Sequence, residues 1–169
     1  MSTETVIAHK SILDALVLKM NDIAVGLPHG TGVTIVQAQK TEELVRDAID
    51  HGAVVASGKL ERNGAQLHPT ILVNVDRSMR IWSEESFGPT VSVVPFSTER
   101  EAVDMANDRD YGLSASVFTK NVPRAIALAK QIQSGSVHIN SMTLHDEIQL
   151  PHGGMKSSGH GRFGVPWGM

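Results

Sequence analysis

Beyond residue 90 the chain alternates short apolar runs with amphipathic segments, and this alternation restricts the possible folds more than any other feature. Val91–Phe96, Leu113–Phe118 and Ser136–Ile139 have the length and apolar character of buried strands. The two segments between these runs have helical spacing. Strands separated by helices predict a mainly parallel sheet that is covered by helices. The expected fold class is therefore α/β.

Helix start signals support the two helices of this region. Thr98 with Glu101 forms a capping-box pattern, in which the hydroxyl accepts a hydrogen bond from the first helical turn. Asn121 can cap the second helix, and Pro123 falls in its first turn, where a missing N–H costs little. Gly135 is a typical residue at which a helix ends. The two helices are therefore predicted after Thr98 and after Asn121.

The first half of the chain is less regular. We expect a strand at Thr5–His9, a helix at 11–24 and a Gly/Pro-rich loop at Gly26–Gly32. A second helix at 41–52 and a short strand at Ala53–Ala56 are expected to follow. Ser11 and Thr41 are the expected N-caps of the two helices. Gly52 is the expected stop of the second helix.

Composition restricts the classes of partner. The 169 residues are 41% hydrophobic and 20% charged, which is typical of a globular domain. The net charge of −3 gives no bias toward nucleic acid or an acidic membrane surface. No apolar run approaches the ~20 residues of a membrane helix, and the first residues carry no secretory signal pattern. We expect a cytoplasmic protein with no nucleic-acid or membrane partner. The absence of cysteine excludes disulfides and thiolate metal sites within the chain.

The segment Glu84–Pro89, which reads E-E-S-F-G-P, directly precedes the strand at Val91. Gly88 tolerates unusual backbone angles and Pro89 fixes φ, so the segment predicts a turn. Two adjacent carboxylates in an extended segment cannot face the same way, so one can face a ligand while the other faces solvent. The alternative is a solvated acidic turn without a function.

The chain beyond residue 140 is rich in glycine and is predicted to form loops. Gly159–Gly164 matches the dinucleotide fingerprint G-x-G-x-x-G, but it neither follows a strand nor leaves room for a βαβ unit. We therefore interpret it as a loop. Lys156 can hold backbone carbonyls or can be solvated, and the sequence leaves both open.

Two other chemistries are disfavoured by spacing. A possible metal cluster fits neither H-E-x-x-H nor another zinc pattern, and catalytic zinc usually needs three well-placed ligands; its members are His145, Asp146, Glu147, Gln149, His152 and His160. The residue types of a Ser/His/Asp hydrolase are present, but no G-x-S-x-G elbow occurs. We expect neither a metal site nor a hydrolase triad within the chain.

Together, Glu84–Pro89 and the G-G-M-K-S-S-G segment at 153–159 resemble the aldehyde dehydrogenase superfamily, whose members oxidise aldehydes to carboxylic acids with NAD or NADP. The resemblance implies cofactor contacts at two positions. The Glu85 carboxylate would accept hydrogen bonds from the nicotinamide ribose, and Phe87 would pack near the nicotinamide ring. A carboxylate suits this role because it accepts hydrogen bonds from both ribose hydroxyls.

The resemblance also implies a substrate class. In this family the loop that corresponds to 141–149 lines the substrate tunnel, which places Leu144, His145 and Gln149 beside a small-molecule aldehyde. The His-Asp-Glu sequence followed by Gln resembles the branch that acts on aromatic aldehydes such as salicylaldehyde, benzaldehyde and vanillin. His152 departs from the P-F-G-G sequence that is usual in that branch.

By the same resemblance, residues 1–169 form a partial catalytic domain that is incomplete at both ends and contains no dinucleotide-binding domain. The nucleophilic cysteine would directly precede Met1, the base and the oxyanion-binding asparagine would also lie before it, and Met169 would precede a strand used in subunit assembly. The chain is then expected to contain no catalytic residue and to be inactive on its own. The first alternative is a non-catalytic remnant that self-associates or binds a partner chain through an exposed apolar face. The second is an unrelated binding module with a parallel sheet.

Overall fold

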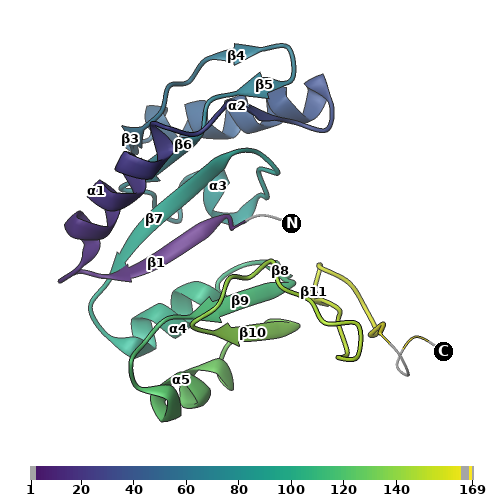
Figure 1. The fold of residues 1–169 in the computed structure, drawn as a ribbon. Helices are drawn as coiled ribbons and strands as arrows, with labels where there is room; N and C mark the ends of the chain where they lie inside the picture. The colour runs from purple at the N-terminus through teal and green to yellow at the C-terminus, as the bar shows by residue number, and fades with distance from the viewer. Residues whose placement is uncertain (1–2, 165–167, 169) are drawn as a thin grey trace. The chain divides into compact units, whose positions relative to one another are not determined.

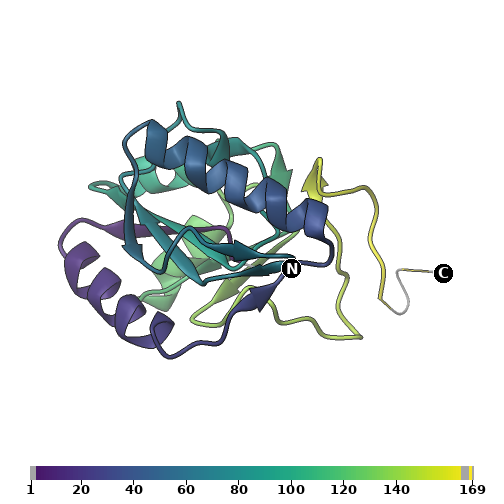
Figure 2. The ribbon, with the colours of Figure 1, turned by 90° about the horizontal axis from the view of Figure 1, so that it is seen from above.

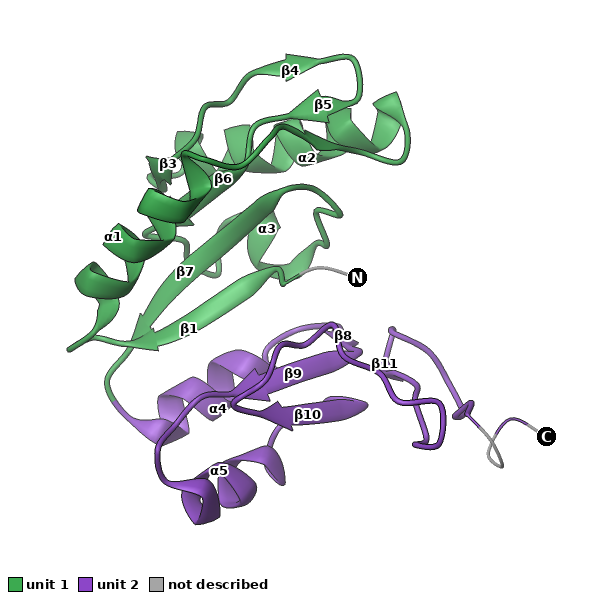
Figure 3. Cartoon of the chain, in the orientation of Figure 1, with its two compact units in different colours: residues 1–97 green, residues 98–169 purple. Residues whose placement is uncertain are grey.

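The chain divides into two units, Met1–Ser97 and Thr98–Met169 (Figure 3). The computed structural model describes residues 3–164 and residue 168. Each unit has its own sheets, and parallel pairing dominates the main sheet of each. The predicted α/β class with a mainly parallel sheet is confirmed. The expected assembly strand beyond Met169 lies outside the described residues.

A four-stranded sheet of order β1-β7-β6-β3 forms the centre of the first unit (Figure 1). β1 (Thr5–His9), β7 (Thr90–Phe96) and β6 (Thr70–Val73) are parallel. β3 (Val54–Ser57) pairs antiparallel with β6 at the edge of this sheet. The strand at Thr5–His9 is confirmed residue for residue, whereas β6 had no sequence-based prediction.

Helices cover both faces of this sheet. α1 (Leu13–Ala24) packs its apolar residues against a cluster of Ala8, Ile71 and Val93 on one face. α2 (Ile35–Asp50) lies on the opposite side of the sheet (Figure 2). Val93 is fully buried, because β7 is a central strand with a helix on each of its faces. The short helix α3 (Arg80–Ser83) precedes the Glu84–Pro89 segment.

Two predicted helix starts are wrong. α1 is preceded by Ile12, which makes no side-chain cap, and the Ser11 hydroxyl instead contacts His9 Nδ1 at 2.8 Å. α2 begins after Thr34, whose hydroxyl accepts a hydrogen bond from the Gln37 N–H at 3.1 Å. Thr41 is buried in the middle of α2. Its hydroxyl lies within hydrogen-bond distance of the carbonyl oxygens of Gln37 and Ser86 and does not cap a helix.

The predicted stop of α2 is confirmed. Gly52 has φ +105 directly after the last helical turn, a conformation that glycine adopts without strain. The predicted loop Gly26–Gly32 contains β2 (Gly30–Thr31), which joins β5 (Gln66–Leu67) and β4 (Arg62–Asn63) in a small antiparallel sheet. Strands of two residues carry too little periodicity to be recognised in the sequence.

The second unit contains a βαβ unit. β9 (Ser114–Val117) and β10 (Ser136–Ile139) are parallel and are connected through α5 (Val122–Ala129). α4 (Glu99–Asn107) precedes them, and β8 (Tyr111–Gly112) pairs antiparallel with β11 (Met155–Lys156).

Both predicted helix caps of the second unit are confirmed. The Thr98 hydroxyl accepts a hydrogen bond from the Glu101 N–H at 3.2 Å. The Asn121 side chain accepts one from the Arg124 N–H at 3.0 Å.

Among residues 3–164, no helix combines the length and the apolar character that crossing a bilayer would require.

An ion pair ties α2 to the small antiparallel sheet. Arg62 Nε lies 2.6 Å from Glu42 Oε2, and both side chains are half-buried. The hydrogen bond from Arg62 lowers the pKa of Glu42 below its ordinary value of 4.5. The stability that this carboxylate contributes is therefore present above the unfolded pKa and is lost as pH falls through the lower, folded pKa.

Glu42→Gln is expected to lower the free energy of unfolding at neutral pH by about 1 kcal/mol, since the pair is partly screened by solvent. The difference from the parent should shrink as pH falls through the folded pKa of Glu42. Urea denaturation over a pH series measures both effects. Glu43→Gln is the matched control, because Glu43 is an exposed residue of the same helix. A Glu42→Gln effect that did not depend on pH would contradict this assignment.

Candidate functional site

The segment Glu84–Pro89 forms a tight turn between α3 and β7, as the sequence predicts. Ser86 at its centre is completely buried, whereas the Phe87 side chain is 55% exposed. Phe87 has φ +49, which is uncommon for a residue with a side chain. The buried Ser86 thus anchors a turn whose next residue, Phe87, exposes its aromatic ring. The contacts around the turn must maintain the unusual backbone conformation of Phe87.

Glu4 holds this turn from the start of β1. Its Oε2 accepts hydrogen bonds from the Ser86 N–H at 3.2 Å and from the Ser86 hydroxyl at 2.8 Å. Its Oε1 accepts a hydrogen bond from the Phe87 N–H at 3.2 Å. One carboxylate therefore satisfies three donors of the turn.

α2 holds the turn from the other side. Thr41 Oγ1 and Gln37 Nε2 each donate a hydrogen bond of 2.7 Å to the Ser86 carbonyl oxygen. Gly88 lies directly against Thr41: a Cβ added to Gly88 would overlap Thr41 Cγ2 and would lie 2.7 Å from Thr41 Oγ1. Glycine is therefore required at 88 because helix and turn are in direct contact.

The two adjacent glutamates of the turn have different surroundings, as the sequence predicts. Glu84 forms an ion pair with Arg80 at 2.8 Å and lies 3.7 Å from Lys40, and the Arg80 hydrogen bond lowers its pKa. Glu85 is half-buried, and its carboxylate accepts no hydrogen bond from any described residue. Burial, and after it the repulsion from Glu4, raises the pKa of Glu85 above its ordinary value of 4.5. Of the two carboxylates, Glu85 is thus the one whose hydrogen-bonding capacity the described residues do not use.

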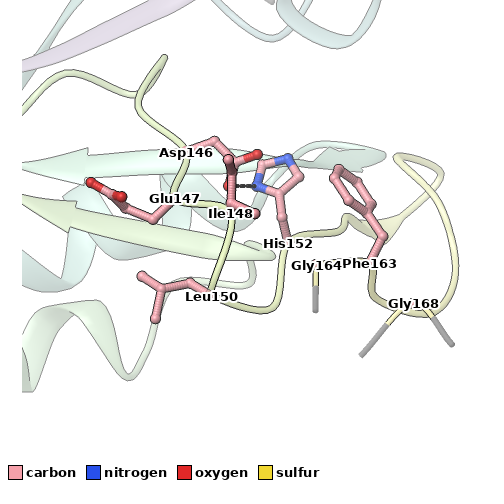
Figure 4. Close-up of a pocket in the computed structure, with 8 residues that line it drawn as sticks. All are labelled: Asp146, Glu147, Ile148, Leu150, His152, Phe163, Gly164 and Gly168. Carbon is pink, nitrogen blue, oxygen red and sulfur yellow. Dashed lines mark ion pairs between the residues drawn. The ribbon is translucent and has the colours of Figure 1, made fainter. Parts of the chain in front are cut away.

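A second candidate site lies in the long loop of the second unit. A cavity of about 360 Å³ is lined there by Asp146, Glu147, Ile148, Leu150, His152, Phe163, Gly164 and Gly168 (Figure 4). His152 Nδ1 lies 3.5 Å from Asp146 Oδ1, and the His152 ring packs edge-on against Phe163. The lining therefore combines apolar side chains with two carboxylates and a histidine, which is compatible with a small ligand that has an apolar body.

None of the three predicted tunnel residues is among the residues that line this cavity. His145 Nε2 contacts Glu147 Oε1 at 2.8 Å, and Gln149 Nε2 donates to Glu147 Oε2 at 3.3 Å. Both side chains are thus held by a residue that lines the cavity. Leu144 is 49% exposed. Their place in a substrate tunnel stays a prediction, as do the cofactor contacts of Glu85 and Phe87.

Within residues 3–164 and residue 168, no three His, Asp or Glu side chains converge in an arrangement that could hold a metal ion. The described acidic and histidine side chains of the 145–152 loop pair with one another instead. These contacts offer a pair, not the three ligands of a catalytic zinc site.

The glycine-rich end of the chain is a structural loop. The interpretation of Gly159–Gly164 as a loop is confirmed, because these residues contain no helix, and Phe163 among them forms an isolated bridge with His152. Lys156 Nζ donates hydrogen bonds to the carbonyl oxygens of Asn107 at 2.6 Å and Arg109 at 2.8 Å. Of the two roles that the sequence left open for Lys156, the structure shows the carbonyl-holding one.

Sequence reasoning missed the residues that hold the turn. Glu4 is 82 positions from Ser86 and Gln37 is 49 positions from it, so no local pattern connects them. The available signal was chemical: a turn with a buried serine needs acceptors for its N–H and hydroxyl groups, and an acidic residue at the start of a neighbouring strand can supply them.

Comparisons with known proteins show which family the sequence of this chain matches. A protein-family model described as the aldehyde dehydrogenase family matches residues 1–169. The vanillin dehydrogenase of Pseudomonas fluorescens is 42% identical over 97% of this chain. The benzaldehyde dehydrogenase of Bacillus subtilis is 39% identical over the whole chain. The chain spans 36% and 37% of the lengths of these two relatives.

Solved structures agree with the sequence comparison. The salicylaldehyde dehydrogenase of Pseudomonas putida G7, solved with salicylaldehyde, superimposes with a TM-score of 0.93 at 35% identity. The match covers 98% of this chain and 36% of that one. A Mycobacterium tuberculosis aldehyde dehydrogenase, solved with NAD+, gives a TM-score of 0.90 at 32% identity, with 97% and 36% of the two chains covered.

Proposed function

The chain belongs to the aldehyde dehydrogenase family, and from this membership we propose that it supplies part of the catalytic domain of an NAD- or NADP-dependent oxidoreductase of aromatic aldehydes. Relatives named for vanillin, salicylaldehyde and benzaldehyde support the substrate class. Structural neighbours solved with NAD+ and with NADP support a nicotinamide cofactor without distinguishing the two.

The observation that carries the proposal is the Glu84–Pro89 turn. Glu85 is a half-buried carboxylate without a hydrogen-bond donor among the described residues, and Phe87, two residues further along the turn, has an exposed ring. A ribose offers the two hydroxyl donors that such a carboxylate lacks, and the aromatic ring offers a surface for a planar heterocycle. The residues present thus fit the nicotinamide end of a dinucleotide.

The chain supplies only some of the groups that the reaction needs. A bound nicotinamide cofactor accepts the hydride of the aldehyde. The chain contributes contacts that orient the cofactor, and under this proposal the loop with Leu144, His145 and Gln149 contributes a wall beside the aldehyde. It contains no cysteine, so the thiolate that attacks the carbonyl must come from outside these 169 residues.

The 169-residue chain, assayed alone with benzaldehyde and either cofactor, is expected to produce no reduced cofactor above the rate without protein. Removing a nucleophile leaves only the residual rate from binding and oxyanion groups. Turnover at a rate typical of enzymes, of about 1 per second or more, would overturn the claim that the chain lacks its nucleophile.

A chimera tests the roles of the individual residues. In it, residues 1–169 replace the matching third of the Pseudomonas putida salicylaldehyde dehydrogenase, which supplies the remaining domains. Glu85→Gln in this chimera is expected to raise KM for the cofactor roughly tenfold, since it removes one charge-assisted acceptor. Glu84→Gln is the matched control, because Glu84 is engaged by Arg80, and it should leave KM within about twofold. Equal effects of the two substitutions would exclude a specific ribose contact at Glu85.

Glu85→Gln should also stabilise the chain at neutral pH. The raised pKa means that the folded state binds the Glu85 proton more tightly than the unfolded state does. Ionisation of Glu85 therefore costs stability as pH rises above the unfolded value, and a neutral glutamine removes this cost. We expect a gain of roughly a few tenths of a kcal/mol near neutral pH, as for a partly exposed site. The gain should vanish well below the ordinary pKa of 4.5. Urea midpoints at both pH values measure it, and a loss of stability at neutral pH would contradict the assignment.

A second candidate function, assembly with a partner chain or a second copy, is favoured by apolar exposure in the first unit. Leu18, Ile23, Val25 and Leu27, which lie in α1 and just after it, are each more than half exposed. Exposed apolar groups in this number favour association. Size-exclusion chromatography over a concentration series tests this candidate. A monomer at all concentrations would exclude self-association.

A further inference from the structure

We propose that Glu4 is a positioning residue, whose carboxylate fixes the turn that presents Glu85 and Phe87 to the cofactor. The inference rests on the proposed function for its consequence in catalysis. Its structural part, the control of the turn by Glu4, stands independently.

The backbone of Glu4 is itself fixed by the central sheet. The Ser92 N–H of β7 donates to the Glu4 carbonyl oxygen at 3.0 Å, and the next residue, Thr5, pairs with Ser92 in the β1–β7 ladder. The side chain of Glu4 therefore starts from a rigid element. Groups held by rigid elements position a site more precisely than groups on free loops.

The Glu4 carboxylate offers only acceptors, and the part of the turn that faces it offers only donors. It accepts from three donors, the N–H and hydroxyl of Ser86 and the N–H of Phe87. A carboxylate only accepts, whereas a glutamine in its place would offer an NH₂ group to at least one of these donors. Ser86 is completely buried, so water cannot freely replace the lost acceptor.

The hydrogen bond to the Phe87 N–H lies at the strained residue of the turn. A non-glycine residue at φ +49 persists only where its surroundings impose that conformation. Without Glu4, Phe87 could relax toward negative φ, and this rotation would redirect both its own ring and the preceding Glu85. Positions 85 and 87 would then no longer present the same surface to a ligand.

Glu4 and the side chains of α2 bind different atoms of the turn. Thr41 and Gln37 hold the Ser86 carbonyl oxygen, whereas Glu4 holds the donors of Ser86 and Phe87. Loss of Glu4 thus leaves the turn attached to α2 at the Ser86 carbonyl oxygen and at Gly88, while the Phe87 N–H between these two points loses its acceptor. We expect a local loosening rather than unfolding of the first unit.

Amide hydrogen exchange of the 169-residue chain tests the structural part. In Glu4→Gln the Phe87 and Ser86 amides should exchange roughly tenfold faster or more, as for the loss of a hydrogen bond to a charged acceptor. Amides of β7 such as that of Val93 should be unchanged. Ser86→Ala, which removes one of the three donors, should have a smaller effect. Glu43→Gln is the matched control, with the same chemical change at an exposed position of the same unit.

Cofactor kinetics of the chimera test the functional part. Glu4→Gln is expected to raise KM for the cofactor about as much as Glu85→Gln does, roughly tenfold, with kcat changed by about twofold or less. A loss of folding would instead lower the amount of active enzyme and therefore kcat. Faster exchange of the Phe87 amide together with a raised KM supports the proposal.

The remaining outcomes overturn one claim or the other. Unchanged exchange at Phe87 in Glu4→Gln overturns the positioning role and leaves the proposed function intact. Faster exchange with an unchanged KM, while Glu85→Gln still raises KM, shows that the turn tolerates the loss and also overturns the positioning role. An unchanged KM in both variants overturns the proposed cofactor contact itself.

Discussion

Gly135→Ala is expected to destabilise the second unit by about 3 kcal/mol or more, which is at the upper end of small-to-large substitutions. A Cβ at this position would overlap the Gly153 carbonyl oxygen and would lie 3.0 Å from the Leu113 carbonyl oxygen. Both obstacles are backbone atoms, so no side-chain rotation relieves the clash. The chain would have to separate the start of β10 from the glycine-rich loop that packs against it.

The expected loss extends beyond one contact because Gly135 connects several elements. Its N–H donates to the Gly112 carbonyl oxygen at 2.9 Å, and the next N–H, of Ser136, donates to the Leu113 carbonyl oxygen at 3.2 Å. Moving Gly135 aside would lengthen both hydrogen bonds at the point where β8 leads into β9. The βαβ unit would then lose the alignment of its two strands.

Hydrogen exchange of the β9 and β10 amides measures this effect, with the β7 amides of the first unit as an internal reference. Ser134→Ala is the matched control at the adjacent position. The Ser134 hydroxyl is buried and has no hydrogen-bond partner in the described part of the chain, so removing it should not reduce stability. Unchanged protection of β9 and β10 in Gly135→Ala would show that the loop around Gly153 is not packed as closely as described.

The sequence predicts those features whose partners are close along the chain. The caps at Thr98 and Asn121 are confirmed because each side chain bonds an N–H three residues later. Thr34 and Gln37 make the same three-residue contact, and the capping-box pattern was present there as well. The Gly/Pro-rich stretch before Thr34 favours a loop, however, and Thr41 with the two glutamates that follow it resembles a helix start more strongly than Thr34 does. The start of α2 was therefore predicted at the wrong residue.

The candidate site shows the same division between local and distant information. The turn at Glu84–Pro89 is predicted from Gly88 and Pro89, which are local, but its unusual backbone angle lies at Phe87 (φ +49) and not at Gly88. Its anchors, Glu4 and α2, follow from sheet pairing and helix packing, which bring together residues more than 40 positions apart. Lys156 is a similar case, since its two acceptors at Asn107 and Arg109 lie nearly 50 residues earlier. Such partners are set by tertiary packing, to which periodicity is insensitive.

Gly88→Ala is expected to destabilise the first unit by about 2 to 3 kcal/mol and to displace the turn. The added Cβ would overlap Thr41 Cγ2 and approach Thr41 Oγ1 to 2.7 Å and Thr41 Cβ to 3.0 Å. Thr41 cannot rotate away freely, because it is buried and its hydroxyl donates to the Ser86 carbonyl oxygen. The clash therefore falls on the contact that joins α2 to the turn.

A double-mutant cycle with Thr41→Ala tests this explanation directly. Thr41→Ala alone should also destabilise, since it removes a buried hydrogen bond to Ser86. It also removes the two atoms nearest to the added Cβ, so the double variant should be more stable than the sum of the single effects by about 1 kcal/mol or more. The exchange of the most protected β7 amides supplies the free energies. Additive effects would mean that the cost of Gly88→Ala does not arise from its contact with Thr41, and that the turn is not held in place by close packing against α2.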